Sequence, residues 1–174
     1  MRKYLLPATV AGAAILSSMS VLASDGTITF AGQLNTSTCT VSAGSAALAV
    51  TLPTLPISAL ASAGTIAGNT PFALSITGCT TTATATTYFE AGANVDSTTG
   101  RLKNTGGATN VQLKLTNANG SAIDLSKTSG AQGVTAATVT AGAATPSFAV
   151  EYYATGAATA GTVASTVTYS MIYN

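Results

Sequence analysis

Residues 160–174 read AGTVASTVTYSMIYN, and from residue 163 onward the side chains alternate in character. Small and hydroxylated residues occupy most of the even positions, and the odd positions hold Val163, Ser165, Val167, Tyr169, Met171 and Tyr173. A period of two in a stretch rich in Val, Thr and Tyr predicts a half-buried β-strand. This strand is long and apolar, and no later strand in the sequence pairs with it. We therefore expect its free edge to bind another chain.

A second alternating stretch, SDGTITFAGQL, occupies residues 24–34. An extended strand would place mostly polar residues on one face, and on the other Gly26, Ile28, Phe30, Gly32 and Leu34. Two interpretations are open at this point. The strand packs into the core of its own domain, or it leaves that domain and completes a neighbouring molecule.

The start of the chain has the pattern of a secretory signal peptide. Arg2 and Lys3 precede a mostly apolar stretch that ends in the small-residue cleavage pattern Val21-Leu22-Ala23. A retained membrane anchor is the alternative, but proline, glycine and serine residues interrupt the stretch, whereas a spanning helix needs about 20 predominantly apolar residues. We expect residues 1–23 to be cleaved and the mature chain to be exported.

Cys39 and Cys79 are the only cysteines, and they lie 40 positions apart. In an exported chain, an even pair of cysteines predicts a disulfide bond. By restricting the unfolded chain, such a bond contributes roughly 3–4 kcal/mol to the free energy of unfolding. Free or catalytic thiols are the alternative, but the chain has no CxxC pattern and no histidine.

Between the two ends, short alternating segments are separated by turn signals. The expected strands cover residues 70–77, 84–91, 111–116, 123–125, 133–140 and 146–153. Seven or more short strands with frequent turns predict an all-β sandwich. The length of 174 residues suits one domain, which we expect to cover residues 35–174.

The composition excludes several function classes. Without histidine, neither a Ser-His-Asp site nor the usual zinc ligation is possible. Only 6% of the residues are charged, and the five acidic residues lie in unrelated sequence contexts. Beyond the N-terminus no cluster of Lys or Arg indicates a nucleic-acid partner. We therefore predict a protein that is not an enzyme and needs no metal or cofactor.

Four motifs in a fixed order carry a family resemblance. They are GTITFAG followed by Cys39, ITGC around Cys79, the segment EYYATGAATAG, and Tyr173 one residue from the end. With these motifs the sequence resembles chaperone–usher fimbrial subunits, and in particular the major pilins of type 1 fimbriae. The resemblance implies an incomplete immunoglobulin-like β-sandwich that lacks its last strand and is completed by donor-strand exchange from the neighbouring subunit.

The resemblance also implies partners and residue roles. Residues 24–34 would be the donor strand, which inserts its face of Gly26, Ile28, Phe30, Gly32 and Leu34 into the next subunit. The acceptor groove and chaperone-binding strand would contain Val163, Val167, Tyr169, Met171 and Tyr173. The implied partners are copies of this chain, other fimbrial subunits, a periplasmic chaperone and an outer-membrane usher.

The resemblance implies a structural subunit of a surface fimbria that serves adhesion and biofilm formation, reached by export through the periplasm. One alternative is a minor or tip subunit, an adaptor or adhesin that binds a host glycan or protein receptor. A tip adhesin of this family usually has an additional lectin domain and no donor strand, so the single domain favours the rod subunit. The other alternative is a free-standing secreted β-sandwich.

Overall fold

The computed structural model describes residues 39–80 and 84–174. The predicted signal peptide and the stretch 24–34 lie outside the described residues. The described strands are β1 (Thr40–Val41), β2 (Ile66–Ala73), β3 (Ile76–Thr77), β4 (Thr84–Phe89), β5 (Leu102–Lys103), β6 (Val111–Asn117), β7 (Ala137–Thr138), β8 (Ser147–Ala154) and β9 (Tyr169–Tyr173). A short helix α1 (Ala43–Ala46) and a 3-10 helix η1 (Ile57–Leu60) lie between strands. Within these ranges, no helix has the length and apolar character needed to cross a membrane.

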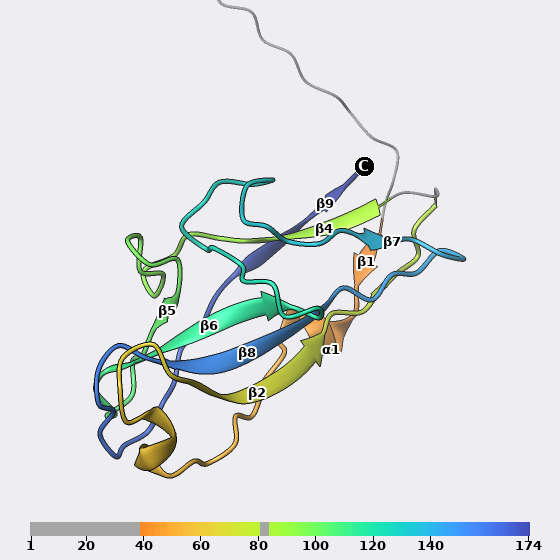
Figure 1. Cartoon of the computed structure of the whole chain (residues 1–174). Coiled ribbons are helices and arrows are strands. Elements are labelled where there is room, and N and C mark those ends of the chain that lie inside the picture. Colours follow the sequence, from red (N-terminus) through yellow and green to blue (C-terminus); the bar gives the residue numbers. More distant parts are fainter. Residues whose placement is uncertain (1–38, 81–83) are drawn as a thin grey trace, which may run out of the picture. The chain divides into compact units, whose positions relative to one another are not determined.

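Two antiparallel sheets form the layers of the sandwich. One has the strand order β2-β8-β6-β5 and the other the order β7-β4-β9, while β1 and β3 form a separate pair. Figure 1 shows β2, β8 and β6 side by side, with β4 and β9 running together in the other layer. The structure confirms the predicted all-β, immunoglobulin-like sandwich, and its open side lies beside β9.

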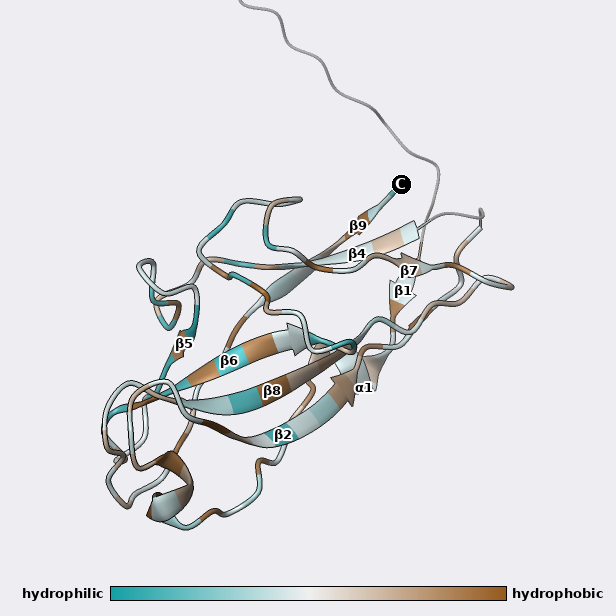
Figure 2. Cartoon of the chain, in the orientation of Figure 1, coloured by the Kyte–Doolittle hydropathy of each residue, from teal (hydrophilic) through white to brown (hydrophobic). Residues whose placement is uncertain are grey.

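The larger sheet follows the alternation of its sequence. In β6, Leu113 and Leu115 are 5% and 3% exposed, whereas the alternate residues Gln112 and Lys114 are only half-buried. Apolar and hydrophilic colours accordingly alternate along β6 in Figure 2. Because successive side chains of a strand point to opposite faces, one face of this sheet packs into the core and the other meets solvent.

Aromatic rings join the two sheets in the main core. The Phe148 ring of β8 lies 5.3 Å from the Phe89 ring of β4 in an edge-to-face arrangement and 5.6 Å from the Phe72 ring of β2. Edge-to-face pairs at such distances add stabilisation beyond the burial of their surface. Phe148 is 2% exposed, so it is the central contact between the layers.

The disulfide bond between Cys39 and Cys79 is formed, which confirms the predicted pairing. It lies beside the β1–β3 pair, in which Thr40 is opposite Thr77. Both half-cystines pack against a small apolar cluster around Ile76. The bond therefore fastens the first described residues to the end of β3.

Several strand predictions differ from the structure: the stretch 70–77 is divided between β2 and β3, and the stretch 133–140 keeps only β7. The regular ladder at the end of the chain covers only Tyr169–Tyr173, although residues 163–168 keep the predicted alternation of exposure. A ladder requires two strands, and the described part of the chain provides none beside these residues. The predicted strand at 123–125 is also absent: Ile123 makes one backbone hydrogen bond, to Leu115 at 3.0 Å, without a continuing ladder.

We predict that Phe148→Ala lowers the free energy of unfolding by about 3–5 kcal/mol, because it leaves a cavity between the two sheets. Urea unfolding of the mature protein followed by circular dichroism measures the change. Lys127→Ala is the control, since the Lys127 side chain is 58% exposed, and it should change the stability by less than about 0.5 kcal/mol. Equal effects of the two substitutions would contradict the central position of Phe148.

Candidate functional site

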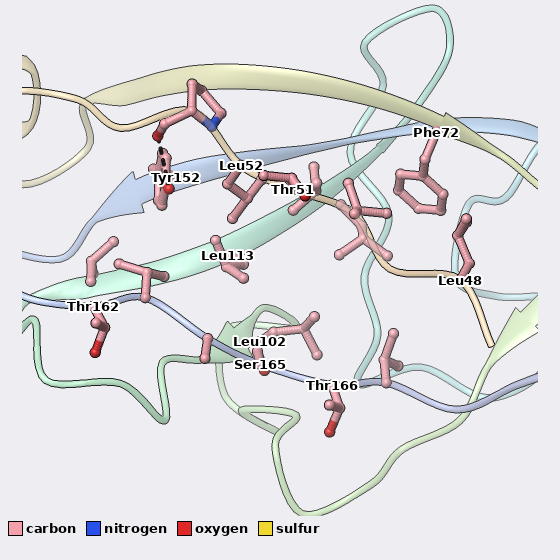
Figure 3. A pocket seen from close by; sticks show the side chains of 18 of the residues that line it. Leu48, Thr51, Leu52, Phe72, Leu102, Leu113, Tyr152, Thr162, Ser165 and Thr166 are labelled. Carbon is pink, nitrogen blue, oxygen red and sulfur yellow. Dashed lines mark hydrogen bonds between the residues drawn. The ribbon is translucent and has the colours of Figure 1, made fainter.

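A groove of about 1310 Å³ runs along the open side of the sandwich (Figure 3). Residues 48–55 form one side, here called the N-terminal wall, and residues 162–171 form the other, the C-terminal wall. Its floor is apolar and includes Leu60, Phe72, Leu74, Phe89, Leu102, Leu113, Leu115, Val150 and Tyr152. Among the described residues that line the groove, none is an acid or a base. The site is therefore suited to apolar side chains rather than to ions.

The even-numbered residues of the C-terminal wall bond away from the groove. The backbone oxygens of Thr162, Ala164 and Thr168 accept hydrogen bonds from the amides of residues 108, 105 and 90, at 3.0, 2.8 and 2.8 Å. The Thr166 oxygen accepts one from the Asn94 side chain at 3.3 Å. In Figure 3 the side chains of Thr162 and Thr166 point away from Leu113 on the floor.

The odd-numbered residues of this wall turn their backbone groups toward the groove. In an extended segment, successive backbone N–H and C=O pairs point to opposite sides of the chain. Within the described part of the chain, the backbone groups of Val163, Ser165 and Val167 have no hydrogen-bond partner. The buried Ser165 hydroxyl has no partner there either.

The same unpaired edge continues into β9. Thr84 and Asn174 exchange two backbone hydrogen bonds, of 2.8 and 3.0 Å. Because bonded and non-bonded pairs alternate along an antiparallel ladder, Tyr169 and Met171 occupy non-bonded positions opposite β4. Their backbone groups also point away from β4, so residues 163–171 present one continuous edge to the groove.

The N-terminal wall is also unpaired. Within the described residues, positions 48–55 make no backbone-to-backbone hydrogen bond. Val50 and Leu52 pack against the main core, and the Tyr152 hydroxyl donates to the Pro53 oxygen at 3.1 Å. Two segments outside any regular ladder thus border the apolar floor on opposite sides.

The titratable groups of the groove are phenols. Burial raises the pKa of Tyr152 and of Tyr169 above the ordinary value of 10.0. Both side chains therefore stay neutral at physiological pH. The Tyr169 hydroxyl donates to the Ser45 oxygen at 2.9 Å, which connects β9 to α1.

The structure brings together four residues of the predicted acceptor strand. Val163, Val167, Tyr169 and Met171 line the groove. Tyr173 lies beyond it and packs against the cluster around Ile76. The predicted donor residues, from Gly26 to Leu34, lie outside the described residues.

Sequence reasoning missed the N-terminal wall as part of the site. A strand-like pattern was present, because the larger apolar residues Leu48, Val50 and Leu52 stand at every second position. The prolines Pro53 and Pro56, however, indicated only a connection or an edge segment. The contribution of the loop 104–108 was also missed, since its Asn and Gly residues predict only a turn.

Glycines allow the loop 104–108 to lie against the C-terminal wall. A Cβ atom at Gly106 would lie 2.2 Å from the Thr162 oxygen, and one at Gly161 would lie 2.5 Å from the Ala108 nitrogen. Both distances are far shorter than van der Waals contact. Only residues without a Cβ atom fit at these two positions.

A β-sandwich with an open apolar groove, bordered by backbone segments outside any regular ladder, defines a class of proteins. These are assembly subunits whose sandwich lacks one strand. The particular family follows from the sequence, since residues 52–174 match the family model of the type-1 fimbrial protein, A (FimA). The chain belongs to this family.

Known relatives agree with the assignment. The chain is 45% identical over 168 residues to the F17 fimbrial protein of Escherichia coli, covering 92% of this chain and 93% of that protein. It is 47% identical over 163 residues to the major fimbrial subunit SMF-1 of Stenotrophomonas maltophilia, covering 87% and 94%. The protein is a structural pilin subunit of a chaperone–usher fimbria.

Solved structures share the fold. A chaperone–usher pilus structure that addresses rod uncoiling matches with a TM-score of 0.65 at 19% identity, covering 90% of this chain and all of that one. The P pilus rod subunit PapA matches with a TM-score of 0.63 at 17% identity, covering 78% and 99%.

We predict that Gly106→Ala lowers the free energy of unfolding by about 1–3 kcal/mol, because the added methyl group pushes the loop off the C-terminal wall. Thermal unfolding of the mature protein measures the effect. Gly92→Ala is the matched control, since a Cβ atom there meets nothing within 4 Å. If both variants keep the parent stability, the close contact between loop and wall is wrong.

Proposed function

We propose that the protein polymerises by donor-strand exchange, with residues 24–34 of one copy seated in the groove of the next. The observation that carries this proposal is the unpaired backbone edge of residues 163–171 beside an apolar groove. An added strand would supply hydrogen-bond partners for this edge and apolar side chains for the floor. This is the physical logic of β-strand addition.

The dimensions and the pattern of the donor stretch support the proposal. At roughly 3.3 Å per residue, residues 24–34 extend over about 36 Å and the edge 163–171 over about 30 Å. A strand paired with that edge turns every second side chain toward the floor. In residues 24–34 these would be Gly26, Ile28, Phe30, Gly32 and Leu34.

The expected energetics favour a durable joint. Burial of Ile28, Phe30 and Leu34 would contribute about 4.5–9 kcal/mol in total, at ~1.5–3 kcal/mol each. Because the donor and the groove are different surfaces of one subunit, the contact does not close on itself and generates a filament. Separation requires the removal of a whole strand from a core, so the joint is kinetically stable.

The proposal extends to the partners of assembly, the export route and the role of the filament. A large apolar groove promotes aggregation unless another chain covers it, which supports a periplasmic chaperone as the first occupant and an outer-membrane usher as the site of exchange.

Residues 1–23 would direct export to the periplasm. At the cell surface the filament would serve adhesion and biofilm formation, and the similarity to a protein named a major fimbrial subunit supports a rod role over a minor or tip role.

We predict that Phe30→Asp abolishes filament formation, because a carboxylate cannot be buried unpaired in an uncharged groove. Electron microscopy and size-exclusion chromatography of the mature protein measure assembly. Thr29→Asp is the matched control, since Thr29 lies on the opposite face of the donor stretch, and it should still polymerise. Normal filaments of Phe30→Asp would refute the donor assignment.

We predict that the melting temperature of the assembled polymer stays level between about pH 6 and about pH 9, because the chain has no histidine. The buried phenols of Tyr152 and Tyr169 have raised pKa values. The stability that depends on their neutral form is complete below about pH 10 and is lost as the pH rises further. Scanning calorimetry across this range measures the profile. A fall in melting temperature below pH 9 would indicate a titrating group that the groove does not contain.

A further inference from the structure

The C-terminal wall is held in two different ways along its length. From Tyr169 onward it belongs to β9 and pairs with β4 in a regular ladder. Among the described residues, no such strand lies beside residues 162–168. They are held from the side opposite the groove by loop backbone and by side chains of Asn94, Asn104 and Thr105. The orientation of this half of the wall therefore depends on individual side chains.

Asn104 makes the largest number of these bonds. Its Oδ1 accepts from the Ala164 amide at 2.8 Å and from the Gly106 amide at 2.9 Å. Its Nδ2 donates to the Ala108 oxygen at 2.8 Å, and to the oxygens of Gly106 and Thr162 at 3.3 Å each. The side-chain amide of Asn104 thus makes hydrogen bonds within the loop 104–108 and also to Thr162 and Ala164 of the C-terminal wall. No other side-chain type offers one acceptor and two donors at this length.

Neighbouring contacts support the same part of the wall. The Thr105 hydroxyl donates to the Ala164 oxygen at 2.9 Å, and the Gly107 amide donates to the Thr162 hydroxyl at 3.0 Å. At the next even position, the Asn94 amide donates to the Thr166 hydroxyl at 2.9 Å. Asn94 contacts only that one residue of the wall, whereas Asn104 contacts two and also closes its own loop.

We propose that Asn104 is a positioning residue for strand uptake: it holds residues 162–164 so that the backbone of Val163 points into the groove. This inference rests on the proposed function. When the even backbone groups are bonded outward, the odd groups must face the groove, because the two directions alternate along an extended chain. The edge is then ready to pair before the donor strand arrives. Without Asn104, the incoming strand must first order this segment, and binding becomes weaker.

The Phe30→Asp chain provides a full-length subunit for the test, because its groove is open to an added peptide of residues 24–34. In this background, Asn104→Asp should weaken peptide binding roughly tenfold or more at neutral pH. A carboxylate still accepts from the Gly106 and Ala164 amides but cannot donate to the Ala108 and Thr162 oxygens, and it repels them. Fluorescence anisotropy of a labelled peptide measures the affinity.

The pH profile distinguishes a positioning role from a general loss of structure. Toward pH 4 the carboxyl group that Asn104→Asp introduces gains a proton and with it one donor, so the peptide affinity should recover. The parent chain should show no such rise. Asn119→Asp is the matched control: Asn119 is exposed in a turn, and its side chain accepts hydrogen bonds from the Ser121 amide and hydroxyl, away from the groove. Its substitution should leave the affinity unchanged at every pH.

The outcomes separate the two hypotheses. If the Phe30→Asp chain does not bind the peptide at all, the proposed function fails. If it binds, but the Asn104→Asp form binds equally well at neutral pH or shows a loss that acid does not reverse, the positioning role of Asn104 fails. Circular dichroism checks that the variant folds. If it does not, Thr105→Val replaces it: loss of the Thr105 bond to the Ala164 oxygen should weaken peptide binding severalfold, and an unchanged affinity overturns the inference.

Discussion

The structure depends on one constraint: an extended backbone edge beside an apolar groove finds no partners for its hydrogen-bonding groups among residues 39–80 and 84–174. Unpaired backbone groups that are shielded from water cost free energy, and so do exposed apolar side chains. At Val163, Ser165 and Val167 the backbone groups have no partner among the described residues, and the apolar floor of the groove beside them is uncovered. A strand from another chain relieves both at once, which is why the open groove and the role of a polymer subunit belong together.

The opposite side of the same wall explains how the edge stays extended. In an ordinary sandwich, ladders on both sides would hold such a segment, but here residues 162–168 have only loop backbone and side chains on one side. The close approach of the loop 104–108 requires glycine at positions 106 and 161. Residues that the sequence marks only as a turn therefore contribute directly to the geometry of the groove.

The scarcity of charge agrees with a structural role. Acidic and basic residues are absent from the described lining of the groove, and burial raises the pKa of its tyrosines Tyr152 and Tyr169 further above neutrality. Interactions of this kind respond weakly to salt and to pH near neutrality. Together with the disulfide bond beside β1 and β3, they suit a subunit that functions outside the cell, where conditions vary.

The sequence by itself determined the all-β class, the pairing of Cys39 with Cys79, and the alternating exposure of residues 163–171, because a period of two and an even pair of cysteines are local signals. It did not determine which backbone edge stays unpaired, nor that residues 48–55 form the second wall. The direction of a backbone hydrogen bond depends on which distant segments lie alongside. Only the tertiary structure brings Asn104 to Ala164 and decides that the odd residues of the wall face an open groove.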